Sequence, residues 1–268
     1  MCLSWLAAAA PGMVAAADRP GEGRARAQLV AGSDRIEPGA SFLLGVRFDI
    51  EPGWHIYWRN PGGAGLATDV SWRLPDGFEV GELQWPLPIG FTQSDGIPGY
   101  GYEGSVVLAA EVRVPPQIDP SAAVVGAEVS WLACRDVCVL GAAALEAPLS
   151  GLPVDPAFTT WAERQPRPLD GADAPFTVTT TGGLADGSLS LWLRWAGAPL
   201  AVSWFPDPEE GLEVGEVATR TRGGLTRIDV PLRRLAGAAA PTELRSLIVV
   251  TDADGGRRGW TLTTDLER

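Results

Sequence analysis

The feature that most constrains the fold is a succession of short apolar segments separated by glycine- and proline-rich turns. Segments of this length suit β-strands, and none shows helical periodicity before the middle of the chain. Turn sequences such as Pro-Gly, Asn-Pro-Gly and Pro-Asp-Gly separate them. In the first half the segments cover 41–50, 54–58, 70–74, 78–80, 106–114 and 124–133. The pattern predicts an all-β fold built from antiparallel sandwiches of immunoglobulin type.

The second half repeats this organisation after a proline-rich interruption. Residues 152–173 predict a linker with a short helix near 158–164. Strand-like segments then resume at 176–180, 189–195, 200–205, 227–232, 247–251 and 259–264. The order Val-Ser-Trp, Pro-Asp, Gly-x-Glu-Val-Gly-Glu occurs at 70–82 and again at 202–216, which indicates duplication. We therefore predict two tandem immunoglobulin-like antiparallel β-sandwich domains, residues 28–151 and 174–268, the second without cysteines.

The N-terminal residues predict export. A small, apolar stretch ends in Ala15-Ala16-Ala17 before Asp18, which has the form of a signal-peptide cleavage site, but no basic residue precedes it. We interpret 1–17 as a truncated signal peptide and 18–27 as a flexible leader. Cys2 lacks the preceding residues of a lipoprotein signal, so no lipid anchor is expected. No later segment approaches the ~18 apolar residues of a membrane helix. The expected product is soluble and periplasmic, where disulfides persist.

Two cysteines lie close together, between two short apolar runs. Cys134 and Cys138 flank Arg135-Asp136-Val137, and the pattern predicts a tight β-hairpin with one thiol on each arm. Facing residues on antiparallel strands have Cα atoms roughly 4.5–5.5 Å apart, which suits a disulfide. Closing so short a loop contributes only about 2 kcal/mol of stability, which weakens the case for a purely structural bond. From chemistry alone, a redox role and a structural role remain about equally supported.

Composition argues against several classes of ligand. The net charge of −12 disfavours nucleic acid, whose phosphates need clustered cations. Two thiolates suit Cu(I), but after removal of 1–17 the chain has one histidine, His55, and no methionine. A Cu(I)-binding copper-tolerance protein therefore stays a minor alternative, and zinc needs about four ligands. We predict neither a cofactor nor a metal.

The abundance of tryptophan leaves a second class of function open. The residues Trp54, Trp58, Trp72, Trp85 and Trp131 are most simply core material. A non-catalytic β-sandwich that binds carbohydrate or protein, with a structural hairpin disulfide, would carry the same residues.

Three motifs together resemble a known family. They are Gly53-Trp-His-Ile-Tyr-Trp-Arg-Asn-Pro-Gly62, Gly99-Tyr-Gly-Tyr-Glu-Gly-Ser-Val-Val-Leu108 and Trp131-Leu-Ala-Cys134-Arg-Asp-Val-Cys138. In this order they look like the periplasmic N-terminal region of DsbD-type thiol:disulfide interchange proteins, closest to the ScsB (suppressor of copper sensitivity) branch. The resemblance is strongest over 40–145. The family's membrane section and C-terminal thioredoxin domain have no counterpart here.

The resemblance implies a protein-disulfide reductase module. Cys134 and Cys138 would take electrons from a membrane-embedded donor protein, supplied separately, and reduce periplasmic thioredoxin-fold proteins. A cap loop between Phe91 and Tyr102 would cover the pair. The residues expected to line or cap the site are His55, Tyr57, Asp95, Tyr100, Tyr102, Trp131, Arg135 and Asp136, with Tyr100 screening the disulfide. Arg135 would favour a thiolate and Asp136 oppose it, and His55 is a candidate proton acceptor.

Overall fold

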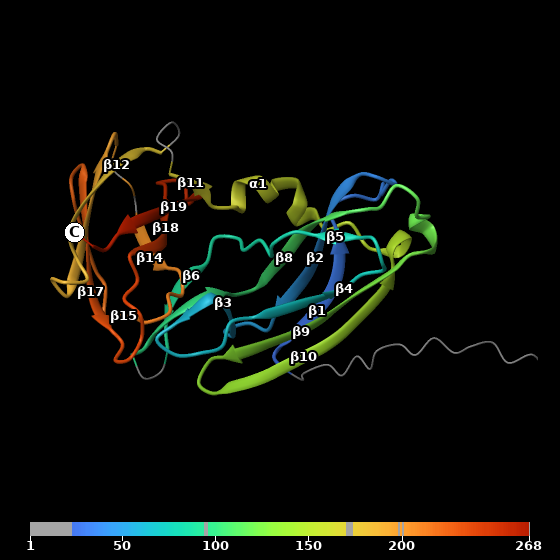
Figure 1. Ribbon diagram of the computed structural model, residues 1–268, viewed down its shortest axis with the longest axis horizontal. Helices are drawn as coiled ribbons and strands as arrows, with labels where there is room; N and C mark the ends of the chain where they lie inside the picture. The colour runs from blue at the N-terminus through green and yellow to red at the C-terminus, as the bar shows by residue number, and fades with distance from the viewer. Residues whose placement is uncertain (1–22, 94–95, 170–173, 198, 200, 268) are drawn as a thin grey trace, which may run out of the picture.

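The chain folds into two β-sandwiches that lie next to each other along the long axis of the molecule (Figure 1). The computed structural model describes residues 23–93, 96–169, 174–197, 199 and 201–267. The predicted signal peptide and the first part of the leader lie outside the described residues. No helix in the described part of the chain is both long enough and apolar enough to cross a membrane.

The first sandwich contains a four-stranded sheet and a six-stranded sheet. The first sheet has the order β1 (Ala25–Ala31), β2 (Ser41–Ile50), β8 (Ser105–Arg113) and β5 (Glu79–Val80). The second has the order β10 (Cys138–Pro148), β9 (Val124–Cys134), β3 (His55–Gly62), β7 (Pro98–Tyr102) and β6 (Ile89–Thr92), with β4 (Asp69–Arg73) also paired to β9. All these pairings are antiparallel.

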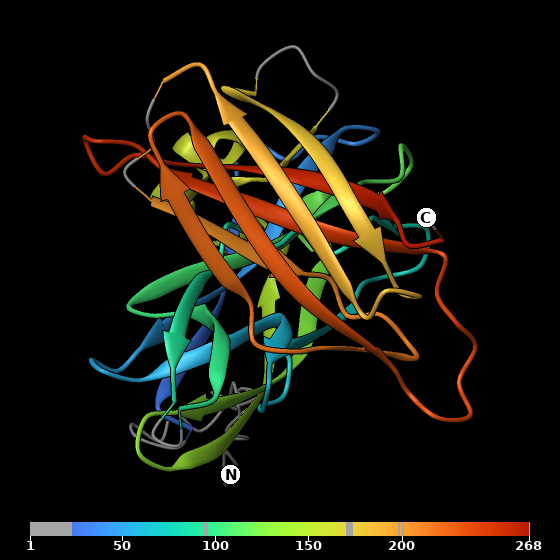
Figure 2. The ribbon, with the colours of Figure 1, turned by 90° about the vertical axis from the view of Figure 1, so that its left-hand side faces the viewer.

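Within the described residues, the second sandwich repeats part of this arrangement, without counterparts of β3, β7 and β6. One sheet has the order β12 (Phe176–Gly183), β13 (Ser188–Trp195), β17 (Leu225–Arg234) and β15 (Leu212–Val214), with β16 (Ala218–Arg222) beside β17. The other has the order β11 (Arg167–Pro168), β19 (Arg257–Asp265), β18 (Glu243–Thr251) and β14 (Ala201–Pro206). The repeated Val-Ser-Trp sequence lies on β4 and β14, which are edge partners of the equivalent strands β9 and β18. Figure 2 shows the two sheets of the second sandwich crossing face to face.

Alternation of apolar and polar residues explains why the strands bury one face. In β13, Leu189, Leu191 and Leu193 are at most 1% exposed, while the first serine and the arginine of the strand are exposed. The first sandwich has its own core, with Phe48 and Trp58 fully buried. The second core is centred on the three leucines and Trp260.

The segment between the sandwiches packs closely against both of them. It contains η2 (Leu149–Gly151), η3 (Pro156–Thr160) and α1 (Trp161–Arg164), and a further turn, η1 (Pro120–Ala122), lies in the first sandwich. Trp161 is buried, and its indole N–H donates to Gln84 of the first sandwich. Further on, β11 pairs with β19 of the second sandwich. The residues expected to form a linker therefore carry apolar side chains that anchor them. At the other end, β1 begins at Ala25, inside the expected leader.

The two sandwiches share packed side chains. Phe205 from β14 is 1% exposed and contacts Trp58 and Tyr100 of the first sandwich, with ring centroids 6.1 Å and 5.1 Å apart. Beside it, Arg59 of β3 pairs with Asp207 at 2.6 Å. β3 therefore connects the cysteine site, at its start, to the inter-sandwich contact, at its end.

Candidate active site

The two cysteines close the hairpin of β9 and β10. Cys134 ends β9, Cys138 begins β10, and the two residues face each other in the ladder and form a disulfide with Cα atoms 4.2 Å apart. The turn between them is Arg135–Val137, in which the Arg135 N–H donates to the Val137 carbonyl at 3.1 Å. Eleven residue pairs continue the same register to Pro148. The hairpin predicted from the sequence, including its three-residue turn, is therefore confirmed.

The two cysteines differ in their exposure to solvent. Cys134 is 3% exposed, and its strand β9 lies between β10 and β3 inside the sheet. Cys138 is exposed, because β10 is the outermost strand of the sheet. A protein that approaches this edge therefore meets Cys138 first.

A histidine and a tyrosine share the face of the sheet that carries the disulfide. His55 is the register partner of Cys134 on β3, so Cys138, Cys134 and His55 form a row across three strands. Facing residues project to the same side of a sheet, as do residues two apart on one strand, which adds Tyr57 to this face. The side chain of His55 is 20% exposed and its Nε2 lies 3.5 Å from a carboxylate oxygen of Glu103.

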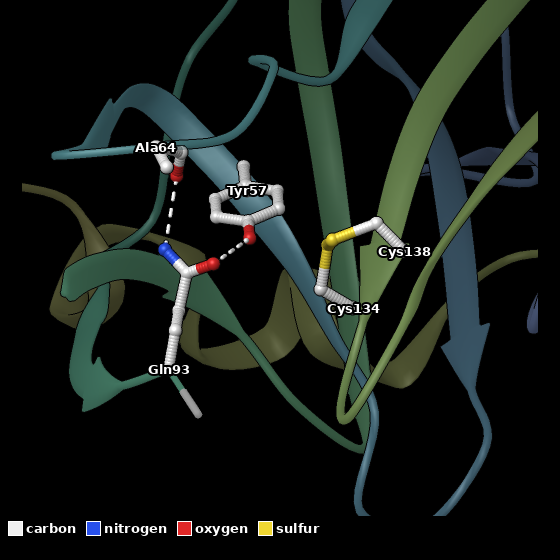
Figure 3. Close-up of a disulfide and its surroundings, with 5 residues drawn as sticks. All are labelled: Tyr57, Ala64, Gln93, Cys134 and Cys138. Atoms are coloured by element: carbon white, nitrogen blue, oxygen red, sulfur yellow. Dashed lines mark hydrogen bonds between the residues drawn. A yellow bond between two sulfur atoms is a disulfide. The ribbon is translucent and has the colours of Figure 1, made fainter. Parts of the chain in front are cut away.

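The β6–β7 hairpin continues the same sheet beside β3, and its side chains reach His55 and Tyr57. Phe91 from β6 stacks on His55, with ring centroids 4.2 Å apart and planes 14° from parallel. The Phe91 ring occupies the space over Gly99, where a Cβ would lie 2.4 Å from it, so only glycine fits at this position. Gln93, at the start of the turn, accepts a hydrogen bond from the Tyr57 hydroxyl and donates one to the Ala64 carbonyl, each 3.1 Å long (Figure 3).

Tyr57 is enclosed between Gln93, at the start of the β6–β7 turn, and the segment that contains Gly65. It is fully buried, and Gly65 lies so close to its ring that a Cβ there would be 2.5 Å from a ring carbon. Burial raises the pKa of the Tyr57 hydroxyl above its ordinary value, because the phenolate would lose its hydration. The neutral hydroxyl is thus a stable hydrogen-bond donor to Gln93.

Comparison with known proteins places this site in a family. Residues 26–150 match the family model described as thiol:disulfide interchange protein DsbD, N-terminal. The first sandwich is a DsbD-type N-terminal domain. No curated protein matches the chain significantly by sequence. Among solved structures, the crystal structure of the N-terminal periplasmic domain of ScsB from Proteus mirabilis matches with a TM-score of 0.69 and 22% identity, covering 92% of this chain and 96% of that chain. That likeness shows a shared two-sandwich fold.

Arg135 and Asp136 lie in the turn of the DsbD-type domain but do not line its buried row. The two side chains pair with each other at 3.0 Å and are 53% and 78% exposed. The Arg135 guanidinium also lies 5.2 Å from the centre of the Trp54 ring, and that of Arg24 lies 5.0 Å from it. These cation–π contacts hold the turn against the β2–β3 connection.

Three predicted site residues lie on the other face of the sheet. Trp131 points into the core, where its ring meets Phe48 edge-on and its N–H donates to the Gly23 carbonyl at 2.7 Å. Tyr102 is 5% exposed and its hydroxyl donates to the Pro86 carbonyl at 2.8 Å. Tyr100 packs against Phe205 of the second sandwich, so it does not screen the disulfide. Asp95 lies outside the described residues.

Phe91 and Gln93, which were not predicted from the sequence as site residues, contact His55 and Tyr57 on this face. Alternation along the β6–β7 hairpin could have indicated the position of Phe91. Phe91 and Gly99 are register partners and project to the same face as Tyr57. Among the described residues, no group of three or more histidine, cysteine, aspartate or glutamate side chains is arranged to hold a metal ion.

Proposed function

We propose that the Cys134–Cys138 pair carries thiol–disulfide exchange in the periplasm. It would receive electrons from a membrane-embedded thiol pair and pass them to thioredoxin-fold proteins. The observation that carries the proposal is that Cys138 is exposed while Cys134 is buried. This pair lies in a domain that matches a family of thiol:disulfide interchange proteins. The ScsB-like two-sandwich fold supports assignment to that branch.

A stapling role explains the pair less well. The hairpin is already held by an uninterrupted ladder of eleven pairs, and the disulfide closes its shortest loop. The entropic gain from so short a loop is only about 2 kcal/mol, against roughly 4–5 kcal/mol for a long loop. The disulfide also joins the ends of two strands of one sheet and does not connect the two sheets of the sandwich.

The exposed cysteine would perform the exchange with the partner. In the reduced protein, the Cys138 thiolate attacks the partner disulfide and displaces one partner sulfur as a thiolate. Cys134, held beside Cys138 by the ladder, then attacks the Cys138 sulfur of the mixed disulfide. This second step releases the other partner sulfur and leaves the Cys134–Cys138 disulfide and a partner dithiol. The same steps in reverse reduce the pair at the expense of a donor dithiol.

The covering residues would restrict this chemistry to docked proteins. We call Phe91 and Gln93 the cover: Phe91 stacks on His55, the register partner of Cys134, and Gln93 accepts a hydrogen bond from Tyr57. A partner that reaches the pair must displace the cover or enter from the β10 side. His55, in register with Cys134 and close to Glu103, is placed to exchange a proton with the buried thiol.

The reduction potential of the pair tests this function. Equilibration of the purified protein in glutathione and dithiothreitol buffers should give a potential above about −300 mV, the range of labile rather than structural disulfides. The reduced protein should also reduce oxidised protein disulfide isomerase, a thioredoxin-fold protein with a potential near −180 mV. A potential well below −300 mV with no transfer would identify a structural bond.

A further inference from the structure

The strand that begins at Cys138 has an unprotected outer edge. β10 is the first strand of its sheet, and within the described residues it pairs with β9 and with no other strand. It runs for eleven residues without a register shift and carries a single charged side chain, Glu146, near its end. Long, regular and uncharged edges are the kind that pair with other chains.

The other edge strands of the four sheets are shorter than β10, and most of them are also charged, covered or end in proline. β5 and β11 have two residues each, and β6 has four. β16 carries two arginines in five residues, and β14 ends in a proline. β1 contains an arginine and is bridged at its end by Val154. β12 is shorter than β10 and has a surface of threonines. Among the described edge strands, β10 is thus the longest, and it begins at Cys138.

The outward-facing backbone groups of β10 begin at Cys138. The short Cα separation of 4.2 Å marks Cys134 and Cys138 as a non-hydrogen-bonded pair of the ladder, whose N–H and C=O groups point away from each other. The N–H of Leu149 donates to Ala123, which fixes the odd-numbered residues as those that face β9. The residues whose backbone groups face outward are therefore Cys138, Leu140, Ala142, Ala144 and Glu146.

These outward groups are free for pairing in the described structure. Within the described residues, no backbone hydrogen bond from outside the hairpin reaches Leu140, Ala142 or Ala144. Their side chains are exposed as well, and Leu140 is 71% exposed. Val137, in the adjoining turn, is 63% exposed. Exposed apolar side chains therefore flank the open edge beside the reactive cysteine.

We propose that the exchange partner docks by adding an extended, uncharged segment to the outer edge of β10, next to its own reactive cysteine. This inference rests on the proposed function and specifies how the partner is recognised. An added strand would form a hydrogen-bonded pair opposite Cys138, with Cα atoms about 5.5 Å apart. That spacing lies within the range of about 4.4–6.8 Å that a disulfide requires. Backbone pairing supplies affinity, and Leu140 and Val137 select apolar residues in the added segment.

The position of the edge explains why the occupant is the exchange partner and not merely another copy of the chain. The free backbone groups are continuous with Cys138, and pairing there brings the partner to this exposed residue while Cys134 stays buried. A second copy would align two identical hairpins and block both cysteines. Sedimentation of the wild-type protein tests this point. A dimer that Ala142→Pro converts to a monomer would overturn the assignment to the exchange partner.

The substitution Ala142→Pro tests the edge directly. Proline removes an outward-facing N–H without removing a ladder bond to β9, so the hairpin should remain intact. We expect the rate of oxidation of the reduced protein by oxidised protein disulfide isomerase to fall about tenfold, the loss expected from one or two backbone hydrogen bonds. The rate with glutathione disulfide, which needs no docked strand, should stay within about twofold of the wild-type rate.

A second pair of variants keeps the test decisive if Ala142→Pro fails to fold. Leu140→Lys places a charge on the edge and should slow the reaction with protein disulfide isomerase relative to glutathione disulfide. Leu235→Lys makes the same change at a 39% exposed leucine of the second sandwich and should leave both rates unchanged. If both edge variants are folded and keep the wild-type rate with protein disulfide isomerase, docking on β10 is wrong. If the wild-type protein reduces neither reagent, the proposed function itself has failed.

Amide exchange gives an independent reading of the same contact. The Cys134→Ser variant, joined through Cys138 to protein disulfide isomerase, should show slowed hydrogen exchange at Leu140, Ala142 and Ala144. The same variant joined to glutathione is the control and should show fast exchange at these amides. Equal exchange in the two adducts would contradict strand addition.

Discussion

The hydroxyl of Tyr57 donates a 3.1 Å hydrogen bond to the side-chain oxygen of Gln93, and this contact joins the β6–β7 turn to the strand that carries His55. Gln93 also donates to Ala64, so one side chain connects three segments around the covered cysteine. Gln93 therefore helps to hold the cover in place beside Tyr57.

Loss of the Gln93 contacts should make the disulfide easier to reach. In Gln93→Ala, each hydrogen bond lost weakens the closed state by about 1 kcal/mol. Reduction of the disulfide by dithiothreitol should therefore accelerate about fivefold or more. Gln117→Ala, at an exposed position remote from the site, is the matched control. Equal rates in the two variants would show that Gln93 does not hold the cover.

The contact between the sandwiches should contribute more stability than an exposed ion pair. Arg59 and Asp207 are 30% and 16% exposed, and two guanidinium nitrogens contact the same carboxylate oxygen at 2.6 and 3.0 Å. Asp207→Asn should lower the free energy of unfolding by about 1–2 kcal/mol, between the values for exposed and buried pairs.

Urea unfolding with an unchanged slope would measure this loss. The control is Glu37→Gln, which breaks a pair whose side chains are 84% and 59% exposed and should cost less than about 0.5 kcal/mol. Similar losses in both variants would mean that the inter-sandwich pair is energetically a surface pair.

The three tyrosines predict a loss of stability at high pH. Burial raises the pKa of Tyr57, Tyr100 and Tyr102, and for Tyr102 the pKa is raised well above its ordinary value of about 10. The folded protein therefore keeps phenolic protons that the unfolded chain has already released. Their contribution to stability is complete below pH 10 and is lost as the pH rises towards the folded pKa values.

Tyrosinate absorbance measures this directly. The native protein should titrate at higher pH than the same protein in guanidinium chloride, where the phenols should titrate near pH 10. Coincident titration curves in the two states would contradict the burial of these side chains.

The cysteine hairpin could be predicted from the sequence because its determinants are local. Two apolar runs flank the three-residue turn Arg135-Asp136-Val137, and Cys134 and Cys138 fall at the strand ends. The succession of strands and the repeated phrase likewise predicted two sandwiches, and the repeat lies on equivalent strands β4 and β14. These features depend on residue spacing, which the sequence states directly.

The cover of the site could not be predicted in the same way. Trp131 is three residues from Cys134, so the two project to opposite faces of β9, and alternation alone should have placed Trp131 in the core. Tyr100 lies against Phe205, more than a hundred positions away in the chain, and no local pattern indicates that contact. Phe91 reaches His55 only because the β6–β7 hairpin folds back over Gly99.

The central claim is that the exposed Cys138 forms the bond with the partner and the buried Cys134 resolves it. Mass spectrometry of reduced single-cysteine variants mixed with oxidised protein disulfide isomerase measures this most directly. Cys134→Ser should accumulate a mixed disulfide through Cys138, because no second thiol is available to resolve it. Cys138→Ser should form at least about tenfold less adduct, since Cys134 is 3% exposed. Equal trapping by both variants, or trapping through Cys134 alone, would contradict the account.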